Sequence, residues 1–187
     1  MRRVDFILAV TLPLCLALSA SPASAQDFPK LKSGQWETTA VLSASPGAQQ
    51  NTHKVTMCTD DTVQKQMMDI GEGMRRDLCS KAEIRREGGK FIGESVCKVE
   101  LGTMTSRSVM TVDGDTAYRT VVSAAYDPPF MGMKESTTTI EGRHVGPCRD
   151  GLVPGDVVTA TGQKFNLKSM ANLPHAMPPA TPPSKVK

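Results

Sequence analysis

The stretch Thr103–Tyr126 reads TMTSRSVMTVDGDTAYRTVVSAAY and decides the fold class of this chain. Both halves are rich in threonine and valine, and the second half also has two tyrosines; these β-branched and aromatic residues favour strands. Between them stands Asp113-Gly114, which suits a two-residue type I′ turn because both central positions of that turn need a positive φ. The stretch therefore predicts two antiparallel strands, Thr103–Val112 and Asp115–Tyr126.

The same strand pattern continues on both sides of this hairpin. Gly88-Gly89 is a second hairpin signal, and Asp127-Pro128-Pro129 is expected to break the run of strand residues. The other expected strands are Gly34–Leu42, His53–Cys58, Ser80–Arg86, Lys90–Leu101, Glu135–Val145 and Val157–Thr161. The fold class is therefore mainly β, an antiparallel meander sheet that is curved or forms a partial barrel, with one short helix and two disulfides.

The one expected helix follows the second strand. Thr59 is the expected N-cap, and Asp60 and Asp61 favour the positive end of the helix dipole. Gly71 and Gly73 are expected to end or fray the helix. The apolar residues that fall on one helical face are Val63, Met67, Ile70 and Met74.

The first 25 residues have the pattern of a signal peptide. Arg2 and Arg3 precede the apolar run Phe6–Leu18, and Ala23-Ser24-Ala25 is typical of a signal peptidase site. The apolar run, about 13 residues long, is shorter than the roughly 20 that a membrane span needs. We therefore expect cleavage near Gln26, a periplasmic protein without a membrane span, a single β-rich domain over 26–172 and a disordered proline-rich tail over 173–187.

Charge and aromatic content exclude a nucleic-acid partner. The 22 lysines and arginines are nearly balanced by 19 aspartates and glutamates. Nucleic-acid binding needs a basic stripe or a stacking platform of aromatic side chains, and the sequence shows neither.

Four cysteines remain after the predicted cleavage: Cys58, Cys79, Cys97 and Cys148. An even number in an exported chain predicts two disulfides, for which three connectivities are possible. The chain has no C-x-x-C motif, which argues against a thiol oxidoreductase or a zinc site.

Strand register bears on the choice among these connectivities. A two-residue turn at Gly88-Gly89 places Ile84 opposite Gly93 and Cys97 on the face away from Cys79. A three-residue turn that includes Glu87 would make Cys79 and Cys97 neighbours, but it would split the apolar residues between the two faces. The favoured pairing is therefore Cys58 with Cys79 and Cys97 with Cys148.

No catalytic set is visible in the sequence. Gly93-Glu94-Ser95-Val96-Cys97 lacks the closing glycine of a nucleophile elbow and lies within an expected strand. His53 and His144 have no nucleophile or carboxylate partner at a recognisable spacing. We expect no catalytic residue, no cofactor and a protein that is not an enzyme.

Methionine is the one unusual side chain, with 11 in the chain. Thioether sulfur is a soft ligand that selects Cu(I), which makes Met131, Met133 and His144 weak candidates for a metal site. Methionine also fills irregular space in cores and forms adaptable apolar surfaces, and this interpretation is the simpler one.

Several motifs resemble a bacterial exported family, domain of unknown function 3617. They are Leu31-Lys32-Ser33-Gly34-Gln35-Trp36-Glu37, Val55-Thr56-Met57-Cys58, Cys79-Ser80-Lys81, Ser95-Val96-Cys97-Lys98, Gly114-Asp115-Thr116-Ala117-Tyr118, Tyr126-Asp127-Pro128-Pro129, Gly146-Pro147-Cys148 and Pro154-Gly155-Asp156. The resemblance implies a small periplasmic β-rich protein and brings no established activity, cofactor or catalytic residue.

The function expected from these observations is a non-enzymatic periplasmic module that binds an apolar ligand or an envelope protein. The alternative is periplasmic copper binding through methionines. A third and weaker hypothesis is an unrecognised hydrolase. It is kept because catalytic sites can be built on many folds.

Overall fold

The structure is a computed structural model that describes residues 28–44, 50–100 and 102–170. These residues fall within the predicted domain 26–172. The predicted signal peptide, 1–25, and the predicted tail, 173–187, lie outside the described residues.

The described residues form one antiparallel sheet, so the prediction of a mainly β protein is confirmed. Its strands are β1 (Gly34–Ser43), β2 (Asn51–Thr59), β3 (Cys79–Glu87), β4 (Lys90–Val99), β5 (Gly102–Asp113), β6 (Ala117–Phe130), β7 (Met133–Gly146), β8 (Asp156–Thr159) and β9 (Lys164–Asn166). Their spatial order is β3-β4-β5-β6-β7-β1-β2-β8-β9, and the sheet does not close on itself. The two helices are α1 (Asp61–Leu78) and α2 (Leu167–Met170). The β9 strand and α2 were not predicted.

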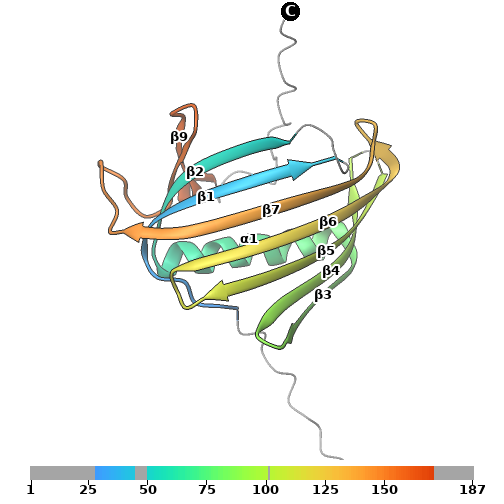
Figure 1. Cartoon of the computed structure of the whole chain (residues 1–187), viewed down its shortest axis with the longest axis horizontal. Coiled ribbons are helices and arrows are strands. Elements are labelled where there is room, and N and C mark those ends of the chain that lie inside the picture. The colour runs from blue at the N-terminus through green and yellow to red at the C-terminus, as the bar shows by residue number, and fades with distance from the viewer. Residues whose placement is uncertain (1–27, 45–49, 101, 171–187) are drawn as a thin grey trace, which may run out of the picture.

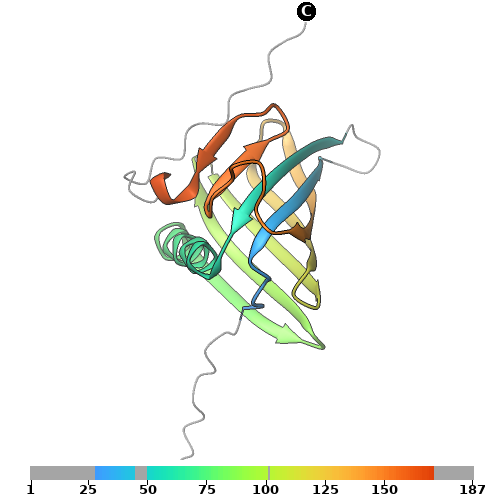
Figure 2. The same ribbon diagram turned by 90° about the vertical axis from the view of Figure 1, so that its left-hand side faces the viewer.

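The sheet is strongly curved, and α1 lies across its concave side (Figures 1 and 2). The helix contacts β3 and β4 on one side of the strand order, and β2 and α2 on the other. It therefore bridges the opening of a partial barrel. Among the described residues, no helix combines the length and the apolar character that crossing a membrane requires.

Cross-strand register separates the two faces of the sheet. Residues directly opposite each other on neighbouring strands point to the same face, and one such row is Phe91, Met110, Thr120, Ile140 and Ala40. This row belongs to the inner face, the face toward α1. On the outer face, charged residues pair across strands, as in Arg107–Glu94 at 2.9 Å and Arg119–Glu141 at 3.1 Å.

The β3–β4 hairpin has the predicted register, but the predicted disulfide pairing is wrong. Ile84 lies opposite Gly93 as expected, yet the register shifts between Cys79 and Lys81 and brings Cys79 opposite Cys97. The extra residue in β3 is Ser80, a β-bulge, which moves the cysteine to the other face without disturbing the apolar residues farther along.

The observed disulfides are Cys58–Cys148 and Cys79–Cys97. The favoured pairs Cys58–Cys79 and Cys97–Cys148 are therefore both corrected. Alternation in a regular strand excluded the Cys79–Cys97 bond, and the bulge removes that exclusion.

The β5–β6 hairpin also differs from the prediction. Asp113 pairs with Ala117, so the loop has three residues, Gly114 to Thr116, in place of a two-residue turn at Asp113-Gly114. Gly114 still adopts a positive φ of 56°. The three-residue loop sets Met110 opposite Thr120, which keeps both residues on the inner face.

Asp127-Pro128-Pro129 does not end its strand, because β6 continues to Phe130. The pairing of β6 with β7 is nevertheless interrupted between Ala125 and Phe130. Proline has no N–H to donate to a ladder, so the segment breaks the pairing and leaves the extended conformation intact.

The helix begins one residue later and ends later than predicted. Its N-cap is Asp60, whose carboxylate accepts from the Val63 N–H at 2.7 Å, in place of Thr59. The helix passes through Gly71 and Gly73 and ends at Leu78. Each glycine lowers the stability of a helix by only about 1 kcal/mol. The disulfides beside both ends of the helix offset that cost.

Candidate ligand-binding cavity

A cavity of about 420 Å³ lies between α1 and the inner face of the sheet. Its size is in the range of sites that bind small molecules. It is lined by Phe28, Pro29, Lys30, Leu31, Trp36, Met57, Thr59, Asp61, Gln64, Lys65, Met67, Met68, Met110 and Tyr118. The lining thus comes from β1, β2, β5, β6, α1 and the segment that precedes β1.

Methionines make up much of the apolar lining. Met57 lies on β2, Met67 and Met68 lie on α1, and Met110 lies on β5. Their flexible, polarizable side chains adapt to occupants of different shape. The cavity therefore has an apolar and deformable wall.

Aromatic residues pack at the β1 side of the cavity. Trp36 is buried, with 2% exposure. Its ring centre lies 5.7 Å from the rings of Tyr118 and His144, and its Nε1–H donates to the Lys32 carbonyl at 2.8 Å. A Cβ at Gly142 would overlap the Tyr118 ring, so the absence of a side chain there lets the ring lie flat on β7. These contacts make this wall rigid.

The segment before β1 forms another wall, and hydrogen bonds fix it to α1. The Gln64 side chain accepts from the Leu31 N–H at 3.1 Å and donates to the Leu31 carbonyl at 2.9 Å. Lys30 pairs with Asp61 at 2.7 Å, and this hydrogen bond is the largest cause that lowers the pKa of Asp61. The Lys32 N–H donates to the Asp115 carbonyl at 2.8 Å, so the segment also joins the β5–β6 loop.

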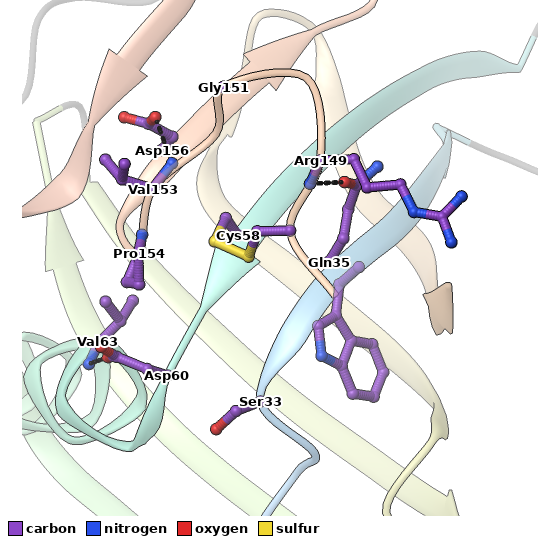
Figure 3. Close-up of a disulfide and its surroundings, with 12 residues drawn as sticks. Ser33, Gln35, Cys58, Asp60, Val63, Arg149, Gly151, Val153, Pro154 and Asp156 are labelled. Atoms are coloured by element: carbon purple, nitrogen blue, oxygen red, sulfur yellow. Dashed lines mark hydrogen bonds between the residues drawn. A yellow bond between two sulfur atoms is a disulfide. The ribbon is translucent and has the colours of Figure 1, made fainter. Parts of the chain in front are cut away.

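Disulfides hold both ends of α1. Cys58 lies on β2 three residues before the helix and bonds to Cys148, which follows β7 (Figure 3). Cys79 directly follows Leu78, the last helical residue, and bonds to Cys97 on β4. The two ends are therefore attached covalently to parts of the sheet far apart in strand order.

Hydrogen bonds fix the loop that follows Cys148. The Arg149 N–H donates to the Gln35 side chain at 3.1 Å (Figure 3). The Gly155 N–H donates to the Cys58 carbonyl at 2.9 Å. Asp156 is buried, with 3% exposure. Its carboxylate accepts from Lys164 at 2.8 Å, from the Val153 N–H at 2.9 Å and from Asn166 at 2.8 Å. The hydrogen bond from Lys164, followed by those from Val153 and Asn166, lowers the pKa of Asp156 to about 2.

Beyond its first turn, the side chains of α1 are packed loosely. Val63 is the one helical side chain that is buried in the described structure. The apolar residues farther along are 38–45% exposed: Met67, Met68, Ile70, Met74 and Leu78. The helix is thus held at its ends by bonds and leaves apolar surface uncovered between them.

Thr59 is a polar residue of the lining that is buried. It lies two residues after Met57, on the same face of β2, and is 5% exposed. Its hydroxyl is the one buried side-chain polar atom without a hydrogen-bond partner in the described part of the chain. Such a group is costly to bury unpaired.

The structure does not bring the predicted metal candidates together. Met131 and Met133 lie at the β6–β7 turn, where Met131 is 68% exposed. His144 lies eleven residues beyond Met133 along β7, a distance of about 36 Å in an extended strand. Its Nε2 is 3.1 Å from the Ser33 carbonyl, against Trp36. Among the described residues, histidine, cysteine, aspartate and glutamate form no group of three that could hold a metal.

A second hollow, of about 490 Å³, lies across β3 to β7 and has a more polar lining. Its charged residues include Glu94, which bonds Arg85 at 3.2 Å and Arg107 at 2.9 Å, and the Arg85 hydrogen bond is the largest cause that lowers the pKa of Glu94. These charges satisfy one another, so the methionine-lined cavity is the stronger candidate for a ligand site.

Sequence reasoning placed Met67 on the apolar face of the helix but missed Met57 and Met110 as members of the same site. Their strands are separated by β6, β7 and β1 in the sheet, and no local pattern shows which distant strands face one helix.

The chain was compared with family models, curated proteins and solved structures, and no curated protein and no solved structure matches it. The family model of a protein of unknown function, DUF3617, matches residues 31–148, which include Trp36, α1, the four disulfide cysteines and most of the sheet. The chain therefore belongs to the DUF3617 family.

Proposed function

We propose that the protein is a periplasmic binding module that holds an apolar small molecule between α1 and the inner face of the sheet and catalyses no reaction. The observation that carries this proposal is the cavity of about 420 Å³ lined by Trp36 and four methionines. Protein interiors are normally close-packed. A space of this size beside uncovered apolar side chains is suited to a ligand.

The exposure of α1 supports the proposal energetically. Full burial of a methionine or leucine side chain stabilises by about 1.5–3 kcal/mol. Met67, Met68, Ile70, Met74 and Leu78 forgo much of that gain because they are 38–45% exposed. A ligand that covers Met67 and Met68 would recover part of it.

The disulfides support the proposed location. Both bonds fit an oxidising compartment, and the signal-peptide pattern in residues 1–25 agrees with export. They also support binding, because bonds at both ends of α1 hold the helix over the cavity without a packed core beneath it.

Polar groups of the cavity support a non-catalytic role. Asp61 is engaged with Lys30 and Ser33, and Gln64 is engaged with the backbone of Leu31. These side chains attach the segment before β1 to α1. General acid–base catalysis needs such a group within reach of substrate and free to exchange a proton.

Trp36 offers a direct test because it is the chain's one tryptophan and lines the cavity. We expect energy transfer from Trp36 to diphenylhexatriene, a hydrocarbon fluorophore, with saturation at one equivalent. Met68→Asp should weaken this binding at least tenfold, because it places a charge in the apolar wall. Met131→Asp is the matched control, since Met131 is 68% exposed and lies outside the cavity.

Absence of saturable transfer in the parent protein would contradict the proposal. Equal weakening by Met68→Asp and Met131→Asp would also contradict it, because the binding would then not be at this cavity. Circular dichroism of both variants checks that the sheet and α1 are retained.

Copper binding is the second candidate, and one observation favours it. Thioether sulfur selects Cu(I), and the side chains of Met57, Met67, Met68 and Met110 line one space. The double variant Met68→Leu, Met110→Leu removes two sulfurs while nearly preserving volume and apolarity. Tight Cu(I) binding that this variant abolishes would establish the copper function. Retained diphenylhexatriene binding without tight Cu(I) binding supports the apolar ligand.

A further inference from the structure

The unpaired hydroxyl of Thr59 restricts the chemistry of the ligand. Thr59 lines the cavity beside Met57, and its hydroxyl has no hydrogen-bond partner in the described structure. Buried polar groups nearly always have a partner. In an apolar cavity, that partner can come from the occupant.

The polar lining residues lie on one side of the cavity. Thr59 ends β2, Asp61, Gln64 and Lys65 belong to the first two turns of α1, and Lys30 is bonded to Asp61. Met67 and Met68 follow along the helix, and Met110 faces the cavity from β5. The cavity is therefore polar near the N-terminus of α1 and apolar beyond it.

We propose that the ligand is a single-chain amphiphile whose head carries a hydrogen-bonding oxygen, an alcohol or a carboxyl group, and that the Thr59 hydroxyl binds this oxygen. This inference rests on the proposed function and deepens it. The aliphatic chain of the ligand runs along Met67, Met68 and Met110, and its head lies at Thr59.

The Thr59 hydroxyl is buried, so it makes this contact after rotation about χ1. A rotation of about 120° moves the hydroxyl to the position held by the methyl group or by the Cβ hydrogen, and each of these positions is a staggered well. A hydroxyl also both donates and accepts. It therefore pairs with an alcohol or with a carboxylate.

The charge near this end bears on which head group is preferred. Lys30 and Lys65 line the cavity, and the ammonium group of each pairs with an aspartate, Asp61 at 2.7 Å and Asp69 at 2.6 Å. These exposed pairs contribute little net field. If no other group contributes, we expect the binding affinities for alcohol and carboxylate head groups to lie within about threefold of each other.

The test compares two variants against three probes, with Trp36 fluorescence as the readout. The probes are decanol, decanoate and diphenylhexatriene, which has no polar atom. Thr59→Val replaces the hydroxyl with a methyl group of nearly the same size and should weaken decanol and decanoate binding by about threefold to tenfold. Diphenylhexatriene binding should stay within twofold of the parent.

Thr59→Ser keeps the hydroxyl and controls for the change of side chain. It should bind decanol within twofold of the parent protein. Thr59→Val should also be at least as stable to heat as the parent without ligand, because it removes an unpaired buried hydroxyl. Stability and affinity therefore change in opposite directions, which loss of structure alone does not produce.

The inference and the proposed function fail in different ways. Failure of the parent protein to bind any of the three probes would overturn the proposed function. Binding of diphenylhexatriene with equal decanol and decanoate affinities in the parent and Thr59→Val would overturn the inference alone. A decanoate affinity more than tenfold above that of decanol, lost in Thr59→Val, would support the inference and assign the head group as a carboxylate.

Discussion

Asp156 shows how a single residue fixes the loop that anchors Cys148. It is 3% exposed and receives hydrogen bonds from Lys164, Val153 and Asn166, which hold the loop beside Cys58. These contacts favour the ionised carboxylate and lower its pKa from 3.8 to about 2. The group therefore stabilises the fold fully above the ordinary pKa, and this contribution is lost as the pH falls from about 4 through 2.

Asp156→Asn should lower the free energy of unfolding at pH 7 and reduce its loss between pH 4 and pH 2. Stability at pH 7 falls because the amide leaves Lys164 without its counter-ion. The loss of stability between pH 4 and pH 2 is reduced because the amide does not titrate. Urea unfolding at a series of pH values measures both effects. Asp69→Asn is the control, because Asp69 pairs with Lys65 through two largely exposed side chains, and such a pair contributes little. Parallel pH curves for the parent and Asp156→Asn would contradict this account.

At the scale of elements, disulfides beside its two ends hold α1 in place. Gly71 and Gly73 lie within it, and a Cβ added at either position meets no atom within 4 Å. Gly71→Ala should therefore raise the free energy of unfolding by about 0.5–1 kcal/mol, because alanine has the better helix propensity. The urea midpoint measures this gain.

Gly93→Ala is the opposite case, on the inner face. A Cβ at Gly93 would lie 2.5 Å from the Ser108 hydroxyl, so we expect this variant to be less stable than the parent. A stabilising Gly93→Ala, or a destabilising Gly71→Ala, would show that the packing described here is wrong.

The sequence predicted the strands correctly where neighbouring residue types, such as a glycine pair at a turn, determine the backbone conformation. The Gly88-Gly89 turn correctly predicted that Ile84 lies opposite Gly93. The pairing of Cys79 with Cys97 was missed because Ser80 forms a bulge, and no residue type there distinguishes a bulge from a regular strand.

The candidate site was less predictable than the strands. The helical period identified the apolar face that includes Met67, and strand composition predicted the strand that carries Trp36. Met57 and Met110 could not be assigned to the same site, because strand order and sheet curvature bring them together, and both depend on the whole chain.

In the whole molecule, a curved open sheet and one bridging helix are joined mainly at the ends of the helix. The largest fully buried side chains, Trp36, Val63 and Cys58, are clustered around the start of α1. Beyond them the helix carries exposed apolar residues over a cavity. This uneven packing is the physical basis for the proposed ligand site.

The most direct test of this account is methyl NMR of protein labelled with ¹³C at its methionine methyl groups, titrated with decanol. The account predicts saturable shifts of the Met57, Met67, Met68 and Met110 methyl signals, since these residues line the cavity. It also predicts unchanged signals for Met131 and Met133, which lie at the β6–β7 turn. Shifts confined to Met131 and Met133, or no saturable shift at any of the four cavity methionines, would contradict it.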